Sequence, residues 1–118
     1  MDKIIKIGDK DVKFKATALT PRKYREIIGR DMITDMNKLQ KAYTSKQKGE
    51  IANFDVLDLQ IFEDSAFIMA SQANPDMEEK TADEWLDTFD MFSIYEIMPE
   101  ILDLWVKNLK TTSTPKKK

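Results

Sequence analysis

The chain has 118 residues, of which 42% are hydrophobic and 34% are charged, and its formal net charge is −2. This length suits one domain with one hydrophobic core, and this composition lies well outside the range of disordered chains. The absence of cysteine and histidine excludes disulfides and thiol chemistry, and it removes the commonest general base and the usual zinc ligands.

The N-terminal segment KIIKIGDKDVKFKA, about residues 3–16, predicts a β-hairpin. Apolar side chains alternate with lysines on both sides of a turn at Gly8, Asp9 and Lys10, which is typical of a strand pair with one buried face. An isolated hairpin is only marginally stable in water, so we expect its apolar face to lie on helices.

Two helices are expected next. The segment LTPRKYREIIG predicts a helix with Thr20 as its N-cap, Pro21 in its first turn and Gly29 at its C-terminal end. A second helix is predicted from about Asp31, followed by a polar connection. Its apolar stripe, with spacings of three and four residues, consists of Met32, Met36, Leu39 and Tyr43.

Asp55 is predicted to cap a third helix that runs to about Gln72. A helix that is apolar on two sides is either buried centrally or shared with a partner, and this one has two apolar stripes. One stripe consists of Leu59, Phe62, Ala66, Met69 and Ala73, and the stripe on the opposite side consists of Leu57, Ile61 and Ile68.

Two capping-box patterns predict the starts of the last two helices: Thr81 with Glu84, and Ser93 with Glu96. Pro99 is expected to kink the final helix or to start it afresh, because proline removes a backbone hydrogen bond.

The pattern as a whole predicts a mainly α-helical α+β fold. An N-terminal β-hairpin would pack on a bundle of about four to five helices in a single domain, residues 1–110. Residues 111–118 would form a flexible basic tail.

Charge is distributed unevenly along the chain. Residues 1–50 carry 13 basic and 7 acidic side chains, whereas residues 51–104 carry 14 acidic side chains and Lys80 alone as a base. This asymmetry indicates either two oppositely charged solvated faces or complementary ends that allow self-association. The hairpin lysines lack interleaved exposed aromatics and the acidic half would repel phosphate, so we expect no nucleic-acid partner.

No catalytic, phosphate-binding or metal-binding motif stands out in the sequence. Its three glycines are too dispersed for a phosphate-binding loop, and no calcium-binding loop is present. No apolar run approaches the roughly 20 residues that span a bilayer, and the N-terminal apolar stretch is too short for a signal peptide. We therefore expect a soluble cytoplasmic protein without enzymatic activity, cofactor, metal or membrane partner.

A monomer of this size has difficulty covering two wide apolar helices on all sides. The candidate partner-binding residues are therefore Leu57, Ile61, Ile68, Trp105 and Val106. The alternative is that the other helices and the hairpin cover them. Six methionines besides the initiator either fill the core or suit a surface that accepts varied partners.

Five segments carry a family resemblance: KIIKIGDKDVKFKAT, TPRKYRE, ADEWLDTFDMF, YEIMPEILDLW and a TSTPKKK end. In this order they resemble the small tail assembly chaperones of long-tailed phages and prophages of Gram-positive bacteria. The resemblance covers nearly the whole chain and is one of pattern and size. It implies a non-structural helper, absent from the finished virion, that coats the long and mostly helical tape measure protein.

The resemblance also implies a second, longer product. In this family a minority of ribosomes shift frame near the end of the gene and append a domain that recruits tail tube protein. Lys116, Lys117 and Lys118 would then mark a slippery run of adenines and form a linker, and the alternative is a plain basic tail. For the whole chain the alternatives are a structural virion protein, such as a head–tail connector or tail completion protein, and a small nucleic-acid-binding regulator.

Overall fold

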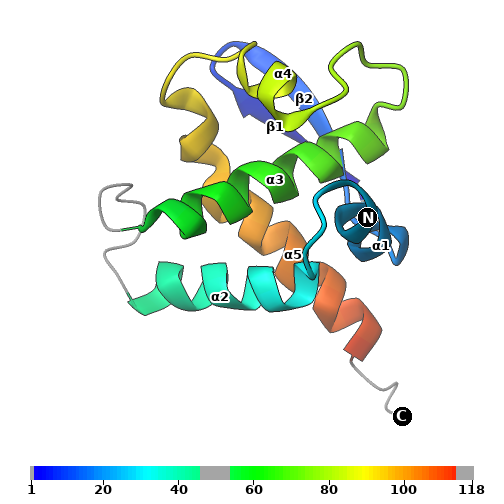
Figure 1. Cartoon of the computed structure of the whole chain (residues 1–118), viewed down its shortest axis with the longest axis vertical. Helices are drawn as coiled ribbons and strands as arrows, with labels where there is room; N and C mark the ends of the chain where they lie inside the picture. The colour runs from blue at the N-terminus through cyan, green and yellow to red at the C-terminus, as the bar shows by residue number, and fades with distance from the viewer. Residues whose placement is uncertain (1, 46–53, 114–118) are drawn as a thin grey trace.

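A two-stranded antiparallel hairpin and five α-helices, with one short 3-10 helix, form the part of the chain that the computed structural model describes, residues 2–45 and 54–113 (Figure 1). The elements in order are β1 (Asp2–Ile7), β2 (Lys10–Lys15), α1 (Leu19–Ile27), α2 (Met32–Ser45), α3 (Val56–Ala73), α4 (Ala82–Leu86), the 3-10 helix η2 (Ser93–Ile97) and α5 (Met98–Ser113). The predicted mainly α-helical α+β fold is confirmed. The predicted tail residues Lys116, Lys117 and Lys118 lie outside the described residues.

The hairpin turns more tightly than predicted. Ile7 pairs with Lys10, so the turn contains only Gly8 and Asp9. Gly8 has a φ of 62°, which glycine adopts without the steric cost that a Cβ atom brings. The alternating pattern is confirmed, since Ile5 and Phe14 are buried on the face that packs against η2 and α3.

Helix α3 is the central element of the molecule. It packs against β2, α1, α2 and α4, and Figure 1 shows it between the hairpin and α2. Asp55 caps it as predicted, and the Asp58 carboxylate accepts a hydrogen bond from the Asp55 backbone N–H to complete a capping box. Most of both apolar stripes is covered, so α3 is buried along its middle, whereas Leu57 at its start stays exposed.

The predicted cap of α1 is wrong. The helix begins at Leu19, and the Thr20 side chain lies inside its first turn. The Thr20 hydroxyl accepts a hydrogen bond from the Thr17 backbone N–H at 2.9 Å and donates one to Gln72 Oε1 at 2.6 Å. A partner on α3 thus uses the side chain that was expected to cap α1. The predicted end at Gly29 is confirmed by its φ of 89°.

The two later capping boxes have different outcomes. Thr81 caps α4 and accepts a hydrogen bond from the Glu84 N–H, although the Glu84 carboxylate binds the Lys80 N–H. Ser93 caps no helix, because the chain there forms a 3-10 turn whose N-cap, Phe92, makes no side-chain bond. Helix α5 begins afresh at Met98, which places Pro99 in its first turn as one of the two predicted outcomes. It continues to Ser113, beyond the predicted end near residue 110.

Candidate partner-binding surface

Three of the five predicted partner-binding residues are in the core, so their expected exposure is wrong. Ile61 and Ile68 have no exposed surface, and 3% of Trp105 is exposed. Each of these three side chains is covered by neighbouring elements, and none can reach a partner while the chain is folded. Leu57, with 41% of its surface exposed, and the half-buried Val106 remain accessible.

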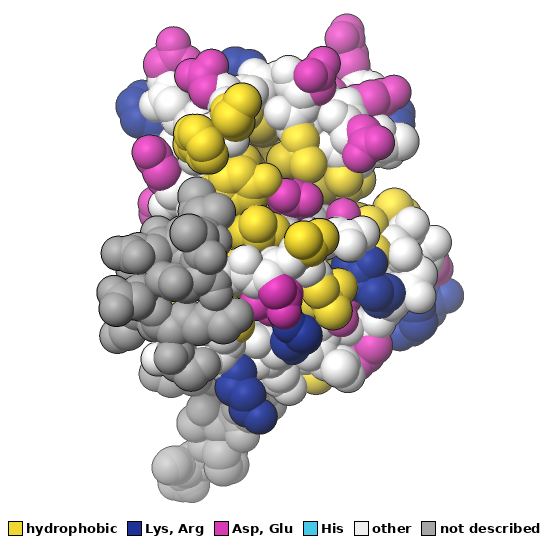
Figure 2. Space-filling view, turned by 60° about the vertical axis from the view of Figure 1, so that its left-hand side comes forward, with side chains coloured by type: hydrophobic (Ala, Val, Ile, Leu, Met, Phe, Trp, Pro, Cys, Tyr) yellow, Lys and Arg dark blue, Asp and Glu magenta, His cyan; other side chains and the backbone are white. Residues whose placement is uncertain are grey.

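Other large apolar side chains are exposed instead. Val56, next to Leu57 at the start of α3, has 81% of its surface exposed. The further exposed ones among the described residues are Ile4, Leu19, Ile27, Ile33, Met91 and Phe92. Figure 2 shows hydrophobic side chains gathered across the middle of one face, with Asp and Glu side chains above and beside them. A contiguous exposed apolar patch with a polar rim marks an interaction site, whereas single exposed apolar side chains are ordinary.

One groove brings exposed apolar side chains and carboxylates together, and we name it the acidic groove. It has a volume of about 300 Å³ and lies between the first half of α3 and the short helix α4. Its lining residues are Val56, Leu59, Gln60, Glu63, Asp64, Ala82, Asp83 and Leu86. Apolar side chains from both helices therefore share a small depression with three carboxylates.

The carboxylates of the acidic groove repel one another. Burial raises the pKa of the Glu63 carboxyl, and the nearby charges of Asp64 and Asp83 raise it further. The Tyr95 hydroxyl donates a hydrogen bond to Glu63 at 2.6 Å, which opposes this rise. Burial and this hydrogen bond raise the pKa of Tyr95 to about 12. The groove is therefore a site where added positive charge is favoured.

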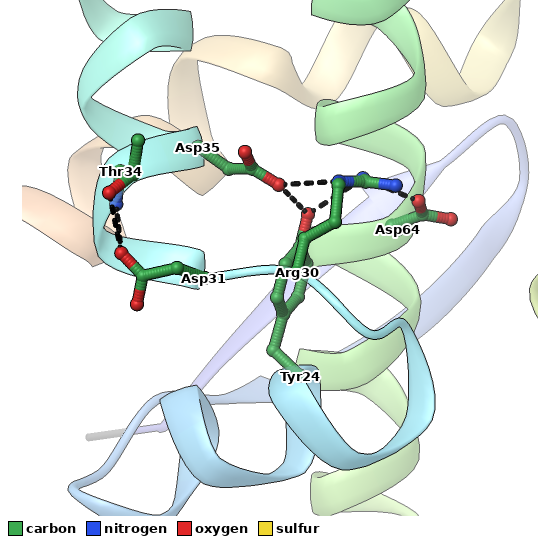
Figure 3. A network of polar contacts seen from close by, with 6 residues as sticks. All are labelled: Tyr24, Arg30, Asp31, Thr34, Asp35 and Asp64. Atoms are coloured by element: carbon green, nitrogen blue, oxygen red, sulfur yellow. Dashed lines mark hydrogen bonds and ion pairs between the residues drawn. The ribbon is translucent and has the colours of Figure 1, made fainter.

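A polar network surrounds Arg30 (Figure 3), and one of its members, Asp64, also lines the acidic groove. The guanidinium donates to Asp35 on α2 at 2.8 Å and to Asp64 on α3 at 2.9 Å. It also donates to the Tyr24 hydroxyl at 3.0 Å, and that hydroxyl donates to Asp35 at 2.7 Å. Burial raises the pKa of Asp64 even though Arg30 lowers it. Helices α1, α2 and α3 are thus joined around one cation.

Sequence reasoning did not predict this network. A signal was present, since Asp64 lies in the middle of an apolar helix and a buried charge needs a partner. The identity of that partner could not be read from the pattern, because Arg30 is 34 positions away along the chain. The second buried carboxylate of α3, Asp58, was also missed, and it pairs with Lys38 of α2.

A second groove lies farther along the chain, between the second half of α3 and α1. It has a volume of about 440 Å³, and the exposed Leu19 and Ile27 of α1 line it together with the buried Phe67. Lys23, Lys80 and Glu79 also line this groove, so it carries both signs of charge. Its charge pattern does not select a partner.

Within residues 2–45 and 54–113, no three or more carboxylates gather closely enough to hold a metal ion. In the same residues, no helix has the length and apolar character that a bilayer crossing requires. Comparisons of the whole chain with protein-family models, with curated proteins and with solved structures found no significant match.

Proposed function

We propose that this protein is a non-catalytic tail assembly chaperone of a long-tailed phage or prophage, which binds the tape measure protein and keeps it from aggregating. The observation that supports this most directly is the acidic groove, where Val56 stays exposed beside other apolar side chains. The resemblance along nearly the whole sequence supplies the identity of the client. Binding would take place in the host cytoplasm, before the virion is complete.

An exposed groove on a packed core suits this task. A long helical client has apolar stripes that would associate with one another in water, and a chaperone must cover them and later release them. Helix-in-groove contact buries such a stripe without any covalent chemistry. The small volume of the groove fits a few side chains of the client, which allows release when tail tube protein takes its place.

The client-binding proposal is tested by co-expression with the tape measure protein. We expect the wild type to keep the tape measure protein in solution and Val56→Gln to do so less well. Ile4→Gln is the matched control, because Ile4 is 64% exposed and lies on the hairpin, outside the groove. Equal aggregation of the tape measure protein with and without the wild type would contradict the proposed function.

The longer product is tested separately. The native gene, expressed with its downstream DNA, should give a major species of 13.7 kDa and a minor larger one with the same N-terminus. If the lysine codons are intact and only one species is made, the extended form that recruits tail tube protein is contradicted.

Mass spectrometry of purified particles distinguishes a chaperone from a structural virion protein. A head–tail connector or completion protein would be present in fixed copy number, and a chaperone would be absent.

A further inference from the structure

We infer that the acidic groove takes an amphipathic helical segment whose apolar residues are flanked by lysine or arginine. This inference rests on the proposed function for the kind of partner, a helical client, and adds the chemistry that the client segment must carry. The occupant is thus a basic amphipathic helix of another protein.

The apolar part of the groove comes from two helices. Val56 and Leu59 belong to the first half of α3, and Leu86 belongs to α4. Val56 is the most exposed large hydrophobic residue among those described, while Leu59 and Leu86 are half-buried against the core. A helix laid along this depression would cover Val56 and touch both walls, with its anchors at spacings of three and four residues.

The charge of the groove selects among such helices. The acidic groove and the network behind it hold four carboxylates, those of Asp35, Glu63, Asp64 and Asp83, and a single guanidinium. Among the described residues, neither Glu63 nor Asp83 forms an ion pair. The raised pKa of the Glu63 carboxyl reflects burial and this excess of negative charge.

Lysine and arginine suit this site for a second reason. Their long apolar stems lie along hydrophobic surface while their charged ends reach outward. On a docked helix they would cover the apolar rim near Val56 and bring their charges to Glu63 and Asp83. A helix flanked by glutamate would add carboxylates to a site that already has too few cations, and like charges placed close together disfavour binding.

The probes are two synthetic helical peptides with the same apolar residues, one flanked by lysine and one by glutamate. Binding to the full-length protein is measured by fluorescence anisotropy at about 0.05 M and about 0.5 M salt, since screening shortens the reach of charges over this range. We expect the lysine peptide to bind at least about tenfold more tightly at low salt, with the difference shrinking at high salt.

Two substitutions localise the effect. Asp83→Asn should weaken binding of the lysine peptide several-fold, and Val56→Gln should weaken it as well. Asp87→Asn is the matched control, because Asp87 is exposed at the end of α4 and does not line the groove. Circular dichroism of each variant confirms that the fold is kept.

Three results would overturn the inference. One is equal affinity for the two peptides at low salt, and another is an equal loss in Asp83→Asn and Asp87→Asn. The third is a dimer in sedimentation that Asp83→Asn disrupts, because the occupant would then be a second copy of this chain. In each case the proposed function would stand if the wild type still holds the tape measure protein in solution, so the two failures are distinguishable.

Discussion

A single guanidinium joins three helices of this protein. Arg30 follows α1 and binds carboxylates on α2 and α3 as well as the Tyr24 hydroxyl (Figure 3). The side chains of Asp35 and Asp64 are each only 13% exposed, so water cannot replace the cation fully. Removing Arg30 would leave two partly buried carboxylates close together, which costs more than the hydrogen bonds alone.

Arg30→Ala is therefore expected to lower the free energy of unfolding by about 3 kcal/mol. The measurement is urea denaturation followed by circular dichroism. Arg22→Ala is the control, because Arg22 forms an exposed ion pair with Glu26 one helical turn away and should cost less than about 0.5 kcal/mol. Equal losses in the two variants would show that the network does not stabilise the fold.

The raised pKa of Glu63 makes stability depend on pH. Its folded pKa lies above the ordinary value of 4.5, so the folded protein binds more protons than the unfolded chain between these two values. Stability contributed by this group therefore falls as pH rises from 4.5 through the folded pKa.

Glu63→Gln removes this titration and still offers an acceptor to Tyr95. We expect the variant to be more stable than the wild type at neutral pH, and the difference to shrink below pH 4.5. Urea midpoints of both proteins across this range provide the check. A difference that stays constant with pH would mean that the carboxyl of Glu63 titrates equally in the folded and unfolded states.

In helix α3, one feature could be predicted from the sequence and another could not. Its cap at Asp55 was predictable, because the capping partners lie within three residues of each other. The burial of its second stripe was not, since that depends on where other elements pack. Thr20 and Ser93 do not cap helices either: the Thr20 hydroxyl binds Gln72 of α3, and the chain from Ser93 forms a 3-10 helix.

In this second stripe Ile68 lies in the covered part and Leu57 lies in the exposed part. Ile68→Ala should cost about 3 kcal/mol, because it leaves a cavity in the core, whereas Leu57→Ala should cost less than about 1 kcal/mol. Thermal or urea unfolding of the two variants measures this difference. Similar small costs at both positions would indicate that the stripe is open in solution, as the sequence alone allowed.

At the scale of the whole molecule, one core connects the hairpin to the last helix. The ring of Trp85 on α4 contacts Phe14 of the hairpin and Phe67 of α3, while Trp105 is buried on α5. The acidic groove also forms only when α3 and α4 pack together. Its two walls are separated in the sequence by the second half of α3 and a loop, so no local pattern could have placed Val56 and Leu86 in one groove.

A shared core predicts that the whole molecule unfolds in one step. Trp85→Phe leaves Trp105 as the sole tryptophan, and Trp105→Phe leaves Trp85. In each variant we expect the fluorescence midpoint in urea to coincide with the midpoint from circular dichroism. Separate midpoints in either variant would show that the hairpin end and α5 unfold independently.

The exposed position of the groove has an evolutionary consequence. Val56 and Asp83 lie at the surface, so mutations there change the partner that the groove accepts with little loss of stability. Arg30, Asp35 and Asp64 are constrained together, because losing one of them upsets the charge balance of the partly buried network. Among related proteins whose clients differ, we therefore expect the sequence to vary first at the rim of the groove and last around Arg30.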